Sequence, residues 1–369
     1  MTYGVIAREL GRRGHSVTVY RPSRPDLQPA AEGPGGSDYT EVMLPGIPVP
    51  GYPQLRLGLP ASRRLQAWWL RSRPDIVHVA TEGPLGHSAV TAARRLGIAV
   101  TSGFHTNFHA YTRHYGIPVL RRPMLAWLRR FHNRTLLTFA PTEELCAELT
   151  RSGFRKLTLM SRGVDTTAFD PERRDDELRR LWGAGPEDPV VIHVGRMAAE
   201  KNYGLLFEVY AAMRRANPRL RFVLAGEGPL RARLERQHPE CVFAGFYSRS
   251  EIGRHYASAD IYVHASLTET FGNVLTEAMA SGLALAGFDY AAGRQFIVNG
   301  VSGLVVPCER PAALAEAAVL LARDAPLRER LRQGARRAVE PQSWQIVIRR
   351  FESELMAVAG VSRGEPVAA

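Results

Sequence analysis

The chain has 369 residues, of which 45% are hydrophobic and 23% charged, a composition typical of globular proteins and enough for two domains of roughly 150 to 200 residues. No apolar stretch approaches the roughly 20 residues of a membrane-spanning helix, and the N-terminus does not predict a secretory signal. The three cysteines are scattered. They predict neither a disulfide framework nor a metal site, and they suit a reducing, cytoplasmic location.

The formal net charge of +12 is concentrated in the first half of the chain. Residues 1–165 hold 22 Lys and Arg against 11 Asp and Glu, whereas residues 166–369 hold 26 against 25. This asymmetry indicates an anionic partner of the first half, which could be a phosphate-bearing substrate or an acidic membrane surface. A general bias toward Arg is the alternative explanation. No recognised nucleic-acid-binding motif is found, so no nucleic-acid partner is expected.

Short apolar runs alternate with longer amphipathic stretches, which predicts parallel sheets covered by helices. The chain opens in an amphipathic helix, so the first strand of a Rossmann-like N-terminal domain is expected to be missing. Residues 22–60 are rich in Pro and Gly and are expected to be mostly loop, with a strand at 41–44. The other predicted elements of this half are strands at 16–20, 76–80, 99–103, 136–140 and 157–160, and helices at 61–72, 86–96, 124–133 and 142–152.

The second half repeats the alternation after a polar segment, 162–189, that is predicted to be a linker. Its predicted strands are 190–194, 221–225, 242–244, 261–265, 283–287 and 303–306, and its predicted helices are 204–216, 230–237, 249–257, 273–280, 312–323, 327–339 and 343–358. The expected fold class is α/β, with two Rossmann-like domains facing across a cleft. Their expected ranges are 1–165 and 166–342, with a closing helix at 343–369.

The most informative segment is 266–282, in which a strand leads through a glycine turn into a helix. Glu269 is placed on the loop, Gly272 in the turn, Asn273 and Val274 at the helix start, and Glu277 inside the helix. A helix N-terminus offers free amides and a positive dipole end, which suit a pyrophosphate, and Gly272 lets the anion approach closely. The two carboxylates can then accept hydrogen bonds from sugar or ribose hydroxyls. A surface helix with two solvated Glu is the alternative.

Two further loops of the second half carry phosphate signals. Arg196 and Lys201 follow strand 190–194 and place cations where a diphosphate would need neutralising. Gly226 and Gly228 form a loop after strand 221–225. Ligands of open α/β sheets lie beyond the carboxyl ends of the strands, so all three loops are predicted to converge on one donor site.

The first half contributes polar and aromatic side chains after two of its strands. His105 comes first after strand 99–103 and is followed by Thr106, Asn107 and Tyr111. Glu82 follows strand 76–80, and its loop is expected to form a wall of the cleft. These residues are assigned to the catalytic and acceptor side, although a single His is more often structural than catalytic.

At these residues the chain resembles the GT-B glycosyltransferases of retaining family 4, group 1. The resemblance rests on the two Glu separated by seven residues, Glu269 and Glu277, on Gly195-Arg196 with Glu200-Lys201, and on the glycine loop 226–229. It covers nearly the whole chain. It implies that 1–165 is the acceptor side, that 166–342 is the nucleotide-sugar side, and that the closing helix 343–369 returns toward the first domain. The stretches 47–53, 78–86 and 104–108 resemble the subgroup of GDP-mannose-dependent α-mannosyltransferases and sulfoquinovosyl- or glucosyl-diacylglycerol synthases.

The resemblance implies a retaining transferase that moves a mannose- or glucose-type hexose from a nucleotide diphosphate sugar, such as GDP-mannose or a UDP-sugar, to an acceptor. It implies that Arg196 and Lys201 clamp the diphosphate and that Glu277 holds the ribose. It places Glu269 at the transferred sugar and His105 near the reacting carbon. No metal and no cofactor beyond the co-substrate are expected. A non-catalytic nucleotide-sugar-binding remnant stays open as the alternative, because the first strand and its loop are expected to be absent.

Two basic segments, 63–71 and 121–130, place Arg beside Trp and Leu at helical spacing. Such a composition can lie in the interface of an anionic membrane, which suggests a peripheral enzyme on the inner face with a lipid or glycan acceptor. The alternative is that Trp and Leu face the core while Arg faces water.

Overall fold

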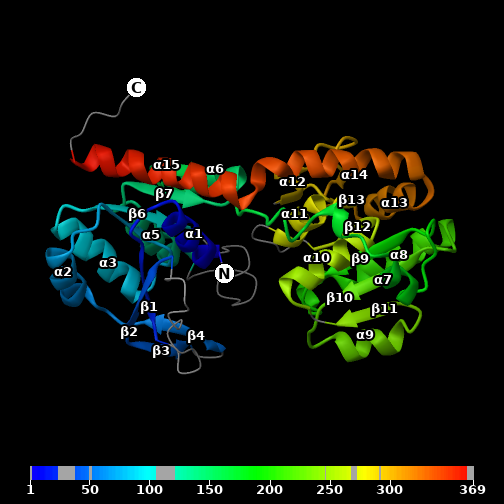
Figure 1. Ribbon diagram of the computed structural model, residues 1–369, viewed down its shortest axis with the longest axis horizontal. Helices are drawn as coiled ribbons and strands as arrows, with labels where there is room; N and C mark the ends of the chain where they lie inside the picture. Colours follow the sequence, from blue (N-terminus) through cyan, green and yellow to red (C-terminus); the bar gives the residue numbers. More distant parts are fainter. Residues whose placement is uncertain are drawn as a thin grey trace. The chain divides into compact units, whose positions relative to one another are not determined.

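The computed structural model describes residues 2–23, 38–49, 52–104, 121–245, 247–266, 272–290 and 292–363. His105, Thr106, Asn107, Tyr111 and Glu269 therefore lie outside the described residues. The chain divides into two compact units (Figure 1). The first unit comprises Met1–Ser161 with Val347–Ala369, and the second unit is Arg162–Ile346.

The first unit is built around a four-stranded parallel sheet in the order β5-β6-β7-β8. Its strands are β5 (Ile76–Val79), β6 (Ala99–Gly103), β7 (Leu137–Ala140) and β8 (Leu157–Leu159). The chain opens in α1 (Thr2–Arg12), and the helices that follow are α2 (Ser62–Arg71), α3 (Pro84–Arg95), α5 (Arg121–His132) and α6 (Glu143–Arg151). Strand β6 is buried along its whole length, as expected for the centre of a parallel sheet with both faces covered.

The segment from 22 to 60 was expected to be mostly loop, and this prediction is wrong in part. Strand β1 (Thr18–Pro22) pairs in parallel with β2 (Thr40–Leu44), close to the strands predicted there. Strands β3 (Gly46–Val49) and β4 (Tyr52–Gly58) form an antiparallel pair that was not predicted. The prolines and glycines of this pair predict a loop. A register shift between Pro48 and Val49 nevertheless allows the two strands to pair.

The closing helix α15 (Trp344–Arg363) belongs to the first unit from Val347 onward. Phe351 is buried, and its ring lies edge-on to His78 and Phe139, with centroids 5.1 and 4.8 Å away. On the same helix Glu352 accepts hydrogen bonds from Arg13 and from the His15 ring. The C-terminal helix thus completes the core and one charged edge of the first unit.

The second unit holds a six-stranded parallel sheet in the order β11-β10-β9-β12-β13-β14. The strands are β9 (Val190–Val194), β10 (Arg221–Ala225), β11 (Val242–Gly245), β12 (Ile261–His264), β13 (Ala284–Phe288) and β14 (Leu304–Val306). Counted from β9, the order is 3-2-1-4-5-6, the doubly wound arrangement. The strand order reverses between β9 and β12, which are paired. That switch point is where such sheets bind ligands.

Helices cover both faces of this sheet, and the strands alternate their side chains between two cores. Val191 of β9 packs in one core with α8 (Tyr203–Ala216), α9 (Arg231–Gln237) and α13 (Pro311–Arg323). Val190 and Ile192 pack in the other core. The helices of that second face are α7 (Asp176–Leu181), α10 (Arg249–Ser258), α11 (Asn273–Ala280), α12 (Ala292–Phe296) and α14 (Ala325–Val339). The β-branched run 190–192 is explained by this burial on both sides.

The segment 162–189, predicted to be a linker, is instead part of the second unit. It contains a 3₁₀ turn, η2 (Pro171–Arg173), and helix α7, whose neighbour Trp182 is buried in the second core. Its polar residues carry structural contacts. Arg179 is only 2% exposed, and its guanidinium lies 2.9 Å from the carboxylate of Asp260. The sequence predicts a solvated charge in this segment, but the charge of Arg179 is buried and paired.

Candidate active site

Three loops at the carboxyl edge of the second sheet are joined by backbone hydrogen bonds. The amide of Gly195, after β9, donates to Ala225 at 3.0 Å, and Met197 donates to Glu227 at 2.8 Å. The amide of Gly226 donates in turn to Gly245 of β11 at 2.7 Å. The loops after β9, β10 and β11 therefore form one connected rim beside the switch point.

The loop after β12 joins the same rim from the other side. The Ser266 hydroxyl donates to the carbonyl of Glu200 at 3.3 Å, and the Asn202 side-chain amide donates to the carbonyl of Ala265 at 3.3 Å. These bonds tie the segment that leads toward Gly272 to the turn η3 (Ala199–Lys201). The predicted donor loops after β9, β10 and β12 are thus brought together.

Two glycines allow this close approach of backbones. A Cβ on Gly226 would stand 2.0 Å from the carbonyl oxygen of Gly195, and Gly226 has a φ of 145°. A Cβ on Gly228 would stand 2.4 Å from the carbonyl oxygen of Met197. Because a side chain at either position would push the two loops apart, their spacing depends on glycine.

Lys201 and Arg196 lie on the loop between β9 and α8. The Lys201 Cε is 3.7 Å from the position that a Cβ on Gly195 would take, so the lysine side chain folds back over the glycine turn. Arg196 is exposed on that turn. The loop thus carries two cationic side chains at the carboxyl end of β9, where a bound diphosphate would need them.

Helix α11 begins at the same edge with a glycine N-cap. Gly272 has a φ of 83° and provides no side-chain cap, and Asn273 and Val274 are the first helical residues. The first amides of a helix have no intrahelical partner and lie at the positive end of the helix dipole. The start of α11 is therefore a suitable place for an anion.

Glu277 lies one turn further along α11, with its side chain 16% exposed. Burial raises the pKa of its carboxyl to about 7, and the nearby charge of Arg249 acts against this rise. The Arg249 Nη2 is 3.6 Å from the Glu277 Oε1. A partly buried carboxylate beside an anion-binding helix start is suited to accept hydrogen bonds from sugar hydroxyls. The pairing of Arg249 with Glu277 was not predicted, because nothing local in the sequence links the two residues.

In the first unit, Glu82 follows β5 and is connected to a buried polar network. Its Oε1 lies 3.2 Å from the Nε2 of His132, which is completely buried. The His132 Nδ1 lies 2.9 Å from the hydroxyl of Ser102 in β6. Glu82 is thus held in place at the carboxyl edge of the first sheet. His132 was not predicted, although a His at a position that continues the apolar face of α5 was an available signal.

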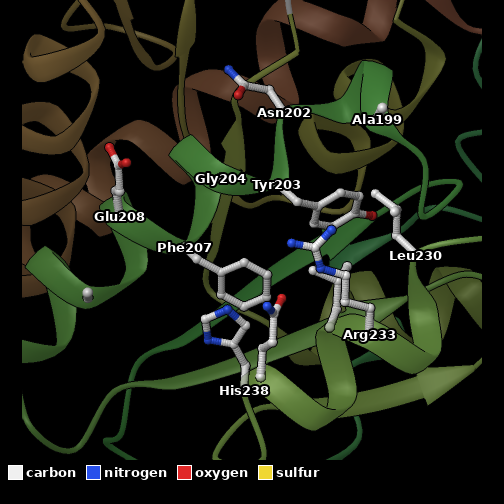
Figure 2. Close-up of a pocket in the computed structure, with 12 residues that line it drawn as sticks. Ala199, Asn202, Tyr203, Gly204, Phe207, Glu208, Leu230, Arg233 and His238 are labelled. Carbon is white, nitrogen blue, oxygen red and sulfur yellow. The ribbon is translucent and has the colours of Figure 1, made fainter.

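A pocket of about 590 Å³ lies between α8 and α9 (Figure 2). Figure 2 shows the rings of Phe207 and His238 facing each other, and they stack with centroids 3.6 Å apart. None of the predicted donor residues lines this pocket, although Ala199 and Asn202 border it. The pocket therefore adjoins the rim at Asn202 but does not include the predicted donor residues.

No group of three or more His, Cys, Asp or Glu suited to hold a metal ion occurs among the described residues. Within the same residues, no helix is long and apolar enough to cross a membrane.

Comparison with known proteins agrees with this geometry. Residues 5–168 match the family model described as Glycosyltransferase Family 4, and residues 174–338 match that of Glycosyl transferases group 1. A GDP-mannose-dependent alpha-mannosyltransferase of Mycobacterium tuberculosis is 34% identical over 96% of this chain and 91% of its own. A sulfoquinovosyl transferase of Arabidopsis thaliana is 31% identical over 85% of this chain and 62% of its own.

Among solved structures, HepE of Anabaena in complex with UDP superposes with a TM-score of 0.77 at 17% identity. The match covers 96% of this chain and 95% of that chain. The chain belongs to the family 4, group 1 glycosyltransferases. The predicted α/β fold of GT-B type and the predicted enzyme class are confirmed, and the catalytic interpretation is favoured over a non-catalytic remnant.

Proposed function

We propose that the protein transfers a mannose- or glucose-type hexose from a nucleotide diphosphate sugar to a lipid-linked acceptor, with GDP-mannose as the first candidate donor. The observation that carries the proposal is the connected rim of loops after β9, β10 and β12, at the sheet edge where the glycine-capped helix α11 begins. The name of the mannosyltransferase relative favours a hexose donor. The names of an alpha-monoglucosyldiacylglycerol synthase and a phosphatidylinositol dimannoside mannosyltransferase among the relatives favour a lipid acceptor.

In this proposal the second unit stabilises the departing nucleotide diphosphate. Arg196 and Lys201 neutralise its charge, while the first amides of α11, at Asn273 and Val274, donate hydrogen bonds to phosphate oxygens. Such preorganised donors and cations stabilise the charge that develops as the glycosidic bond breaks. They can do so without a metal ion or a further cofactor. The Glu277 carboxylate accepts hydrogen bonds from the ribose.

The remaining roles follow the family resemblance. Glu269 contacts the transferred sugar, and His105 lies near the reacting carbon. Thr106, Asn107 and Tyr111 act on the acceptor side. Glu82 joins them as a carboxylate whose orientation is fixed by the buried His132. The anomeric configuration is retained.

A thermal-shift panel with GDP, UDP, ADP and their sugars tests the donor site. Ligand at 100 times its Kd adds about 2.7 kcal/mol to stability, which corresponds to a rise in Tm of about 5 °C or more for a unit of this size. We expect this rise with GDP and GDP-mannose, and we expect Lys201→Ala to abolish it. Lys156→Ala changes the only other lysine of the chain, which is exposed on the first unit, and serves as the matched control. A Lys201→Ala protein that responds like the parent would refute the assigned donor site.

The lipid acceptor suggests that the enzyme works at an anionic membrane surface, and two helices of the first unit support this. On α2, Leu65 and Trp69 are buried, whereas Arg63, Arg64 and Leu70 are exposed. Packing in the core thus accounts for Leu65 and Trp69. The exposed side of α2 is basic and carries one leucine, Leu70. On α5, Trp127 is 46% exposed beside two exposed arginines, Arg129 and Arg130.

Liposome flotation tests the membrane surface. We expect the protein to float with anionic vesicles, to be released from them by salt, and not to bind neutral vesicles, because the attraction between the basic helices and the membrane is electrostatic. Replacing both Arg129 and Arg130 with Gln is expected to weaken binding to anionic vesicles by about 30-fold, at roughly 1 kcal/mol per charge. Arg215→Gln removes an exposed charge of the second unit and is expected to change nothing. Equal failure to float with both vesicle types would contradict the proposal.

A further inference from the structure

Arg249 is held at a defined position by the start of α10. Ser248 and Glu251 form a capping box, in which the Ser248 hydroxyl accepts from the Glu251 amide and the Glu251 carboxylate accepts from the Ser248 amide at 3.0 Å. Arg249 is the first helical residue after this cap. Its backbone is therefore fixed, although its side chain is 43% exposed.

The guanidinium of Arg249 lies between an aromatic ring and a carboxylate. Its Cζ is 5.4 Å from the centroid of the Phe169 ring, and its Nη2 is 3.6 Å from the Glu277 Oε1. Phe169 is fully buried and packs edge-on against Tyr256 at 5.7 Å, so the ring itself is immobilised. The ring limits the positions open to the guanidinium and keeps its charge beside Glu277.

We propose that Arg249 is a positioning residue for donor binding, because it holds the Glu277 carboxylate ionised and oriented to accept the hydrogen bonds of the donor's ribose. This inference rests on the ribose-binding role proposed for Glu277. An ionised carboxylate accepts at both oxygens, and hydrogen bonds to it are roughly twice as strong as those to a neutral group.

The ionisation of Glu277 is finely balanced near neutral pH. Burial raises the pKa of Glu277 to about 7, and the charge of Arg249 opposes that rise. Without Arg249 the pKa of Glu277 would be higher still. A larger fraction of the protein would then carry a protonated Glu277 at pH 7 and would bind the donor weakly.

Other charged and titratable groups on the elements packed against α11 are directed to other partners. On α14, Arg336 and Arg332 donate to the carbonyls of Ala280 and Gly282, at the C-terminal end of α11. On α10, the Tyr256 hydroxyl donates to the carbonyl of Val274; burial, together with the charges of Tyr262 and Glu277, raises its pKa, so Tyr256 stays neutral. The remaining groups and their partners are Arg254 with Asp175, His255 with the carbonyl of Glu251, Arg294 of α12 with Asp289, and His264 of β12 with the ring of Tyr262.

The test is the pH dependence of affinity for GDP-mannose, measured by calorimetry from pH 5.5 to 8.5 on the full chain. A nucleotide diphosphate sugar is the right probe because its phosphates do not titrate in this range. We expect the affinity of the parent to rise with pH through about 7. We expect Arg249→Gln to move this midpoint upward by about 0.5 to 1 pH unit, to lose several-fold in affinity at pH 7 and to recover at pH 8.5. Arg249→Lys, which keeps the charge, is expected to restore most of the parent profile.

Each alternative outcome has a separate meaning. If Glu277→Gln binds like the parent at every pH, the proposed role of Glu277 fails. If Glu277→Gln weakens binding but Arg249→Gln keeps the parent midpoint, the positioning role of Arg249 is refuted. A loss in Arg249→Gln that is the same at every pH would also refute it, because Arg249 would then contact the donor directly.

Discussion

Replacing Glu277 with Gln is expected to make the protein more stable at neutral pH and nearly inactive. The pKa of Glu277, raised to about 7 by burial, lies above the ordinary value of 4.5. The ionised form is therefore disfavoured in the folded protein, and the difference corresponds to about 3 kcal/mol of lost stability once Glu277 is fully ionised. Gln has a similar shape and cannot ionise, so it removes this cost.

The direction with pH follows from the raised pKa. Between about pH 4.5 and pH 7 the folded state binds more protons at Glu277 than the unfolded state does, so this group lowers stability as pH rises. Above pH 7 its contribution is constant. We expect the free energy of unfolding of Glu277→Gln to exceed that of the parent by an amount that grows from pH 5 to pH 7 and then levels off.

Urea unfolding at several pH values measures this difference, and Glu316→Gln, an exposed change on α13, provides the control without a pH-dependent gain. In the same preparations the transferase rate with saturating acceptor is expected to fall about 100-fold, because hydrogen bonds to a charged acceptor contribute about 1.5 to 3 kcal/mol each. A variant with parent stability at pH 8 would show that Glu277 carries no buried charge.

Asp260→Ala is expected to destabilise the second unit by about 3 to 5 kcal/mol. Asp260 precedes β12 and is nearly buried, and its carboxylate accepts from Arg179 at 2.9 Å, from Arg174 at 3.1 Å and from the Val190 amide at 2.8 Å. Removing it would leave the guanidinium of Arg179, which is 2% exposed, as an uncompensated buried charge. A buried charge without its partner is far more costly than a broken surface pair.

The pKa of Asp260 sets the pH range of this effect. Burial by itself would raise the pKa, but the charges of Arg179 and Arg174 outweigh it and hold the pKa below its ordinary value. A lowered pKa stabilises the folded state above the ordinary pKa of Asp, and the contribution is lost as pH falls through the folded value. The deficit of Asp260→Ala should therefore be largest at neutral pH and shrink in acid.

Urea midpoints at pH 7 and pH 4 measure the deficit. Asp289→Ala breaks an exposed pair with Arg294, whose side chains are 45% and 50% exposed, and is the matched control. It should change stability by no more than about 1 kcal/mol. If Asp260→Ala and Asp289→Ala lowered the free energy of unfolding by the same amount, the Asp260 carboxylate would not be needed to balance the buried charge of Arg179.

The regular parts of the fold could be predicted because their signals are local. Strands 190–194, 221–225 and 99–103 are observed at the predicted bounds, since each is a short run with few charged residues that ends at a glycine or directly before one. The pair β3–β4 was missed because its prolines and glycines gave a loop signal. Helix α7 was missed because its charged residues mask an element that is stabilised by a contact far away in sequence. For α7, the decisive contact joins Arg179 to Asp260.

The same distinction between local signals and distant contacts applies to the candidate site. The loops at 195–201 and 226–228 were found from their glycines and cations, and their hydrogen bonds now connect them. The pairings of Arg249 with Glu277 and of His132 with Glu82 were not predicted, because the partners are 28 and 50 residues apart in the sequence. A single sequence shows which residues can carry charge, but only packing shows which charges meet.

The contribution of α15 to the first unit has a consequence for how the chain folds during synthesis. Residues that complete the first unit, among them Phe351 and Glu352, are synthesised after the whole of the second unit. The second unit is contiguous and can form as soon as residue 346 is available. The segment made first therefore lacks the contacts of Phe351 with His78 and of Glu352 with Arg13 until α15 has been synthesised. Nascent chains stalled before residue 347 should expose the N-terminal half to proteases, while those released at full length should not.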